Sequence, residues 1–170
     1  MAIKYVDYQK RWNSDGASPW RRWTHWKPLS EAQPPPAPGA YVVGLRLGGG
    51  RQLVVPRLLG NDEQGALDIG ESGDLLARIT SLQGCASGRH ARGHMAGWRY
   101  RYLRLADKLP VGDLVVAWRL GQDSYLLEAE TMVAYVNAFG ELPPLNYKAN
   151  WKLVKEVGGY LAVTRDSITT

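Results

Sequence analysis

The sequence predicts an α+β fold, in which helices flank a small mixed or antiparallel sheet. Apolar residues recur at helical spacing after Asp74 and again over residues 124–139, which predicts two helices. A length of 170 residues suits one domain with an appendage. Segments rich in β-branched or alternating residues are typical of strands, and the four strand candidates are residues 40–47, 52–55, 66–69 and 113–120.

Three regions follow one another along the chain. Residues 1–37 are predicted to form an aromatic and basic arm that ends in a proline-rich connector, which is extended because each proline fixes its own φ angle. Residues 38–150 are predicted to form the compact domain, and residues 151–170 a short tail.

The arm contains four of the seven tryptophans of the chain. Trp20, Trp23 and Trp26 recur every third residue after Ser18-Pro19, a pair that suits the start of a short helix. The rings can stack on nucleic-acid bases, or they can pack the arm against the domain. Packing is the favoured interpretation, because three such rings are costly to leave in water.

The strand candidates are connected by glycine-rich turns. Gly48–Gly50 separates the first two strands and lacks the Lys-Ser/Thr ending of a phosphate-binding loop. A second turn over residues 60–65 leads into the third strand. Residues 98–105 alternate between aromatic and basic side chains, and this alternation predicts a further strand.

The two helices have recognisable ends. Asp74 or Ser72 can cap the first helix at its N-terminus. Gly140 is predicted to end the second helix, and Pro143-Pro144 prevents its continuation.

The charge of the chain favours a polyanionic partner. The net charge is +5, with 21 basic and 16 acidic residues. Between Arg78 and Leu105 there are six arginines and two histidines and no acidic residue. A local excess of this kind attracts nucleic acid through its phosphates.

Composition argues against several other classes. The single cysteine, Cys85, excludes an internal disulfide and a cysteine metal cluster. The sequence has no apolar run long enough to span a bilayer and no apolar leader after Met1. We therefore expect a cytoplasmic protein that does not interact with a membrane.

Three separated residues carry groups suited to phosphodiester cleavage. Tyr41 offers a phenol, Arg78 a guanidinium and Glu128 a carboxylate. Cleavage requires an oriented and deprotonated water, neutralisation of the charge on phosphorus, and stabilisation of the leaving oxygen. These three groups can divide that work.

In their order and context, these residues resemble the GIY-YIG nuclease superfamily. Gly39-Ala40-Tyr41 is similar to the first signature of the family, and Asp68-Ile69-Gly70 to the second. The stretch from Gly70 to Ile79 is similar to the family segment that carries an arginine about two turns after the glycine. Pro143-Pro144-Leu145-Asn146 is similar to the family's ending, so the resemblance covers most of the chain from Pro38 to Asn146.

The resemblance implies a role for each group. Tyr41 is implied as the general base or as the phenol that orients water, and Arg78 as the arginine that clamps the phosphate. Glu128 is implied as the ligand of Mg²⁺ or Mn²⁺, with Glu130 as the alternative. Asn146 is implied either to fix the chain end or to contact the site.

Asp68 stands where the second signature of the family carries a tyrosine. An aspartate can act as an extra metal ligand or as the base, or it can repel phosphate and silence catalysis. A histidine can compensate for the missing tyrosine as a proton acceptor near neutral pH, and His94 is a better candidate than His90.

We therefore expect a divalent-metal-dependent endonuclease that acts on double-stranded DNA. Two alternatives stay open: a degenerate nucleic-acid-binding module, and a protein-interaction domain that uses the tryptophan-rich arm. The residues expected to contact DNA outside the catalytic group are Arg46, Arg57, Arg89, Arg92, Arg99, Arg101 and Asn146.

Overall fold

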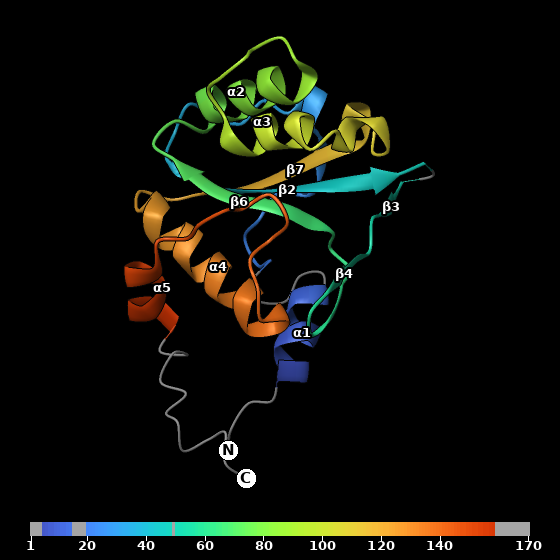
Figure 1. The fold of residues 1–170 in the computed structure, drawn as a ribbon. Helices are drawn as coiled ribbons and strands as arrows, with labels where there is room; N and C mark the ends of the chain where they lie inside the picture. Colours follow the sequence, from blue (N-terminus) through green and yellow to red (C-terminus); the bar gives the residue numbers. More distant parts are fainter. Residues whose placement is uncertain (1–4, 15–19, 49, 159–170) are drawn as a thin grey trace.

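A central antiparallel sheet separates two groups of helices in the computed structural model, which describes residues 5–14, 20–48 and 50–158 (Figure 1). Helices α2 and α3 cover one face of the sheet, and α4 with α1 and α5 lies on the other (Figure 1). The helices are α1 (Tyr5–Asn13), α2 (Leu75–Ser87), α3 (Met95–Tyr102), α4 (Ser124–Phe139) and α5 (Trp151–Gly158). Three short 3-10 turns are η1 (Leu29–Glu31), η2 (Leu105–Asp107) and η3 (Val111–Asp113).

The sheet is built around β2, which pairs antiparallel with β6 on one side and β7 on the other. The short β1 extends the sheet beyond β7, and β3 pairs with the far end of β2. A separate hairpin joins β4 to β5. The strands are β1 (Lys27–Pro28), β2 (Gly39–Leu47), β3 (Arg51–Gln52), β4 (Val55–Arg57), β5 (Gly60–Asp62), β6 (Ala66–Ser72) and β7 (Leu114–Leu120). The α+β class is confirmed.

Alternation along β2 divides the core into two parts. Tyr41, Val43 and Leu45 face the layer of α2 and α3, whereas Val42 faces the layer of α4. Successive strand residues point to opposite faces. The residues in the first half of β2 are all buried, because helices cover both faces of the sheet.

Most of the predicted elements of the domain are present. The structure confirms strands at β2, β6 and β7 and helices at α2 and α4. Asp74 caps α2, with its carboxylate accepting from the Ala77 amide at 2.9 Å. Gly140 ends α4 in the left-handed region at φ 73°, as predicted. The second predicted strand, 52–55, is reduced to β3, and Val55 belongs instead to the β4–β5 hairpin.

The prediction of a strand over residues 98–105 is wrong, because this segment begins as helix α3. His94 caps α3 by accepting from the Gly97 amide. Gly97 lets α3 approach α2 closely, since a Cβ at this position would lie 2.8 Å from the Leu82 carbonyl oxygen. Helix packing therefore overrides the two-residue alternation.

The prediction of a helix through Trp20, Trp23 and Trp26 is also wrong. Residues 20–22 form a turn and residues 23–26 have no regular secondary structure, while Ser18-Pro19 lies outside the described residues. Helix α1, which the sequence patterns did not indicate, packs its Trp12 against α4.

The arm tryptophans pack against one another and against the domain. Trp12 is fully buried, and its indole N–H donates to the buried Asp62 carboxylate at 2.8 Å. Trp20 is also buried, and its indole N–H donates to the Trp12 carbonyl at 2.5 Å. Trp23 and Trp26 are half-buried beside Trp20. This arrangement favours packing over base stacking for these rings. None of the described helices is both long enough and apolar enough to traverse a bilayer.

Candidate active site

The side chain of Tyr41 lies across β6 at Gly70, the residue of that strand that has no side chain. The register places Tyr41 opposite Gly70, and a Cβ on Gly70 would overlap the Tyr41 hydroxyl. The tyrosine is 1% exposed. Glycine is therefore needed at residue 70 because the phenol occupies the space of its side chain.

His94 holds the Tyr41 hydroxyl from the N-terminus of α3. Its Nε2 lies 2.8 Å from the phenol oxygen, while its Nδ1 accepts from the Gly97 amide at 3.4 Å. An accepting Nδ1 carries no proton, so the neutral ring has its proton on Nε2 and donates to Tyr41. Burial, with the charge of Arg78, lowers the pKa of His94 to about 3. The ring is thus neutral near pH 7.

Asp68 lies on the same face of the sheet as Tyr41. It pairs opposite Val43 in the register, two residues along from Tyr41, and it is 5% exposed. Burial raises the pKa of the Asp68 carboxyl to about 7, against the opposing effects of the Arg78 charge and the Tyr41 hydroxyl. Burial, and then the charge of Asp68, also raises the pKa of Tyr41 well above its usual range.

Arg78 brings a cation to these groups from the second turn of α2. Its Nε is buried and has no hydrogen-bond partner among the described residues. Burial lowers the pKa of the guanidinium, but Tyr41, Asp68 and Glu71 outweigh that effect and raise it overall. Arg78 therefore stays charged beside Tyr41 and Asp68.

Glu128 reaches the same region from α4. Asp123 caps this helix by accepting from the Leu126 amide at 3.0 Å, so Glu128 lies in its first turns. Burial, and then repulsion from Glu71, raises the pKa of Glu128 to about 7, while Arg78 lowers it. Glu130 instead faces Arg119, at 3.6 Å. The structure thus joins Glu128, and not Glu130, to Tyr41 and Arg78.

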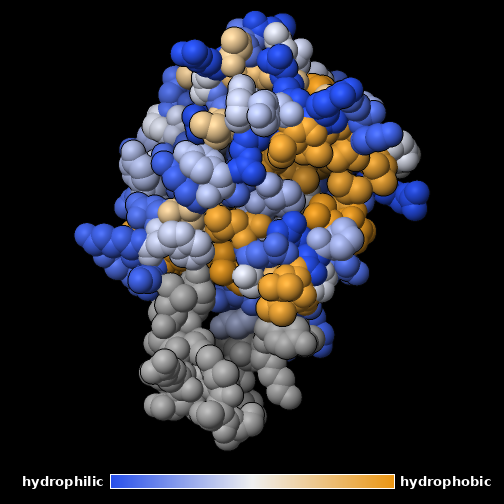
Figure 2. All heavy atoms as spheres, viewed as in Figure 1, coloured by the Kyte–Doolittle hydropathy of each residue, from blue (hydrophilic) through white to orange (hydrophobic). Residues whose placement is uncertain are grey.

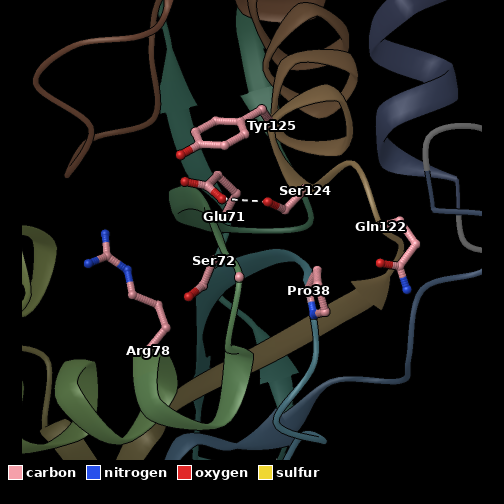
Figure 3. Close-up of a pocket in the computed structure, with 8 residues that line it drawn as sticks. Pro38, Glu71, Ser72, Arg78, Gln122, Ser124 and Tyr125 are labelled. Carbon is pink, nitrogen blue, oxygen red and sulfur yellow. Dashed lines mark hydrogen bonds between the residues drawn. The ribbon is translucent and has the colours of Figure 1, made fainter.

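Glu71 and Ser124 belong to the site although the sequence analysis did not select them. The Ser124 hydroxyl donates to the Glu71 carboxylate at 2.6 Å (Figure 3). Both residues line a cleft of about 450 Å³, into which Arg78 projects from the opposite side (Figure 3). The position of Glu71 directly after Gly70 was the available signal. The cleft is lined by Pro38, Glu71, Ser72, Gly73, Arg78, Gln122, Ser124 and Tyr125.

Asn146 closes the free edge of β6. Its side chain accepts from the Ile69 amide and donates to the Ile69 carbonyl, both at 2.8 Å. The neighbouring Leu145 amide donates to the Leu67 carbonyl at 2.7 Å. Asn146 therefore holds the backbone between Asp68 and Gly70, while a contact with DNA stays a prediction.

The arginines expected to bind DNA differ in their surroundings. Arg57 is tied to Glu141 and to the Leu142 carbonyl, each at 2.8 Å, and its side chain is 9% exposed. Arg46 is half-buried and donates to Gln52. Arg99 is half-buried on α3. The exposed members of the set are Arg89, Arg92 and Arg101.

The carboxylates suit a hard cation that completes its coordination with substrate and water. The described residues contain no group of three or more His, Cys, Asp or Glu side chains placed to hold a metal ion. Two carboxylates lie near each other, since the charge of Glu71 contributes to the raised pKa of Glu128. Mg²⁺ is usually held by one or two carboxylates together with phosphate oxygens. Glu128 with Glu71 fits that pattern.

A search of protein-family models, of curated proteins and of solved structures found no match to this chain.

Proposed function

We propose that this chain is a divalent-metal-dependent endonuclease of the GIY-YIG type that cleaves double-stranded DNA. One observation carries the proposal: Tyr41, Arg78 and Glu128 come from β2, α2 and α4, yet they lie close enough together for the charges of Arg78 and Glu128 to shift the pKa of Tyr41. Residues so distant in sequence form a single polar group beside an open cleft. Perturbed titratable groups that converge in a cleft are typical of active sites.

The cleft offers a binding place for a phosphate. Arg78 lines it and carries a positive charge, and phosphate oxygens are good acceptors for a guanidinium. Ser72 and Gly73 line the same cleft beside the start of α2. The phosphate would thus lie between Arg78 and Glu71, which line the cleft from α2 and β6.

The proton of the attacking water passes to Asp68 through Tyr41 in this proposal. Tyr41 accepts from His94, so its own O–H is free to donate toward the neighbouring Asp68. Its raised pKa keeps Tyr41 a phenol, whereas Asp68, with a pKa raised to about 7 by burial, can take up a proton near neutral pH. The water oxygen forms the new bond to phosphorus as the bond to the leaving oxygen breaks.

Glu128, with Glu71 beside it, would hold the divalent ion. A bound Mg²⁺ or Mn²⁺ neutralises charge on the phosphoryl group and stabilises the leaving oxygen. Glu71 is kept in place by Ser124 and lines the cleft from β6. Glu128 lies on α4, close enough to Glu71 for that carboxylate to raise its pKa.

Plasmid nicking in the presence of Mg²⁺ tests the proposal. We expect wild-type protein to nick DNA, and Arg78→Ala and Glu128→Gln to abolish nicking. Two matched controls should retain it: Arg51→Ala removes an exposed arginine of β3, and Glu130→Gln changes the glutamate that faces Arg119. Equal loss in Glu130→Gln and Glu128→Gln would contradict the assignment of the site.

A second candidate is a DNA-binding module that does not cleave. The observation in its favour is Asp68, a buried acid where the family has a tyrosine, beside a Tyr41 that is 1% exposed. In that case DNA would be retarded in a salt-dependent way but not cut. A protein-interaction domain, the third candidate, would bind no DNA in the same assay.

A further inference from the structure

Helix α3 exposes two of its three aromatic side chains and buries its small ones. Ala96 and Gly97 pack toward the domain, together with Tyr100. Trp98 and Tyr102 are 39% and 70% exposed. Large exposed aromatic residues on a short helix are unusual for a monomer and typical of binding surfaces.

Three exposed residues and the half-buried Arg99 form one stripe along α3. Met95, Trp98, Arg99 and Tyr102 follow the i, i+3, i+4, i+7 spacing of a single helix face. Trp98 and Tyr102 stack on each other, with ring centroids 4.6 Å apart and planes at 14°. We call these four residues the aromatic stripe. Figure 2 shows an apolar area bordered by hydrophilic residues over the segment that follows α3.

Cations lie beside the rings. The Arg99 guanidinium lies 5.9 Å from the centre of the Tyr147 ring, and the Lys148 ammonium lies 5.3 Å from the same ring. Tyr147 is 54% exposed. Aromatic rings interleaved with cations suit nucleotides, because rings stack on bases while cations contact phosphates.

The aromatic stripe is attached to the candidate active site. Helix α3 starts at His94, which holds Tyr41, and Trp98 follows four residues later, roughly 6 Å along the helix axis. Arg99 lies close enough to Asp68 for its charge to act on that carboxyl. Tyr147 follows Asn146, which clasps β6. The aromatic stripe and Tyr147 are therefore positioned by the elements that carry the proposed catalytic residues.

We propose that the aromatic stripe stacks on unpaired bases, so that the preferred substrate is duplex DNA with a bulge or single-stranded flap beside the scissile phosphate. Paired bases bury their faces in the helix stack, and only unpaired bases can lie on Trp98 and Tyr102. The absence of acidic residues between 78 and 105 leaves nothing there to repel the backbone. This inference rests on the proposed nuclease function and names its substrate class.

The test compares a plain duplex with the same duplex carrying a three-nucleotide bulge. Binding is measured by fluorescence anisotropy of labelled DNA in Ca²⁺, and cleavage is measured separately in Mg²⁺. We expect wild-type protein to bind the bulged duplex about tenfold more tightly, since stacking on aromatic side chains contributes about 1–3 kcal/mol per base. Tyr102→Ala and Trp98→Ala should lose this preference and keep their affinity for plain duplex.

Two further variants guard against a folding defect. Trp98→Phe keeps an aromatic face and should retain the preference, and Trp151→Ala removes a 42% exposed tryptophan on α5 as a matched control. Melting temperatures identify any variant that is unfolded. Unchanged preference in Tyr102→Ala and Trp98→Ala, or equal affinity of wild type for both duplexes, would overturn the inference.

The two proposals fail in different ways. Tight binding of bulged DNA without cleavage would support the proposal that the aromatic stripe binds unpaired bases, and it would contradict the proposed nuclease function. Equal cleavage of plain and bulged duplex would support the proposed nuclease function and contradict the proposal that the aromatic stripe binds unpaired bases. Loss of self-association in Trp98→Ala, with no change in DNA binding, would assign the stripe to a protein interface and overturn the inference.

Discussion

The hydrogen bond between Tyr41 and His94, at 2.8 Å, joins the centre of the sheet to the start of α3. One nitrogen of the ring caps the helix and the other holds the phenol. A single neutral histidine thus links the group proposed to handle water with the helix proposed to bind bases. Its expected role is to position Tyr41, because a pKa of about 3, lowered by burial and by Arg78, leaves it unprotonated near neutral pH.

Replacing His94 should separate its two tasks. His94→Asn keeps a side chain suited to capping α3 but is too short to reach Tyr41, so its melting temperature should stay near that of wild type. His94→Ala loses both contacts and should melt about 2–4 °C lower for each kcal/mol lost. Both variants should cleave about a hundredfold more slowly, because a misplaced catalytic group costs that much. Wild-type cleavage by His94→Asn would show that the bond to Tyr41 is not needed.

A methyl group at residue 70 should displace Tyr41. Gly70→Ala puts a Cβ in the space of the phenol hydroxyl, and overpacking of this kind costs about 1–3 kcal/mol. We expect lower thermal stability and a loss of DNA cleavage. Gly112→Ala is the matched control, because a Cβ there meets no atom within 4 Å and the residue lies outside the cleft. Similar melting temperatures and nicking rates for the two variants would contradict the close contact.

Elements that depend on local signals could be predicted from the sequence, and elements that depend on packing could not. The end of α4 follows from Gly140 alone, which adopts φ 73°. Helix α3 could not be predicted, because its alternating residues suit a strand and its helical form depends on Gly97 packing against α2. Distant contacts carry that information, and local patterns do not.

The same division applies to the candidate site. The order of short motifs indicated Tyr41, Arg78 and Glu128, which the structure brings together. Glu71 was missed because alternation along β6 directs it away from Asp68, toward α4. Its importance depends on the distance between β6 and the start of α4, which no local pattern reports.

Mg²⁺ should stabilise the folded protein through Glu128. A cation that binds only the folded state raises its stability with concentration, and here it also relieves the repulsion between Glu71 and Glu128 that contributes to the raised pKa of Glu128. We expect a rise in melting temperature with millimolar Mg²⁺ at about pH 8 in wild type and in Glu130→Gln. The rise should be absent in Glu128→Gln. An equal rise in all three proteins would place the ion elsewhere.

Stability should fall as the pH rises from about 4 to about 7. The ordinary pKa of an aspartate is about 3.9, whereas burial raises the pKa of Asp68 to about 7. In this window the folded state binds more protons than the unfolded state, so the free energy of unfolding decreases with rising pH. Glu128 acts in the same direction, since burial and Glu71 raise its pKa. His94 acts in the opposite direction, because burial and Arg78 lower its pKa to about 3, so the expected decrease is the net effect of two carboxyls against one imidazole. Thermal melts across the window should show a shallower decrease in Asp68→Asn, and an unchanged slope would contradict the burial of an ionisable carboxyl.

Cleavage should rise with pH where stability falls. Asp68 can accept a proton from Tyr41 only when ionised, so kcat/KM should increase about tenfold per pH unit below about 7 and level off above it. Glu128 must also be ionised to hold the cation, and saturating Mg²⁺ separates the two effects because cation binding favours the ionised carboxylate. Under that condition the remaining pH dependence belongs to Asp68. Asp68→Asn, which keeps the shape but accepts no proton, should lose both the activity and the rising limb of the pH profile.

Asp68→Tyr restores the residue of the family signature and tests whether the native aspartate limits the rate of cleavage. Faster cleavage by that variant would mean that the native aspartate dampens activity, and the route of the proton through Asp68 would then be wrong.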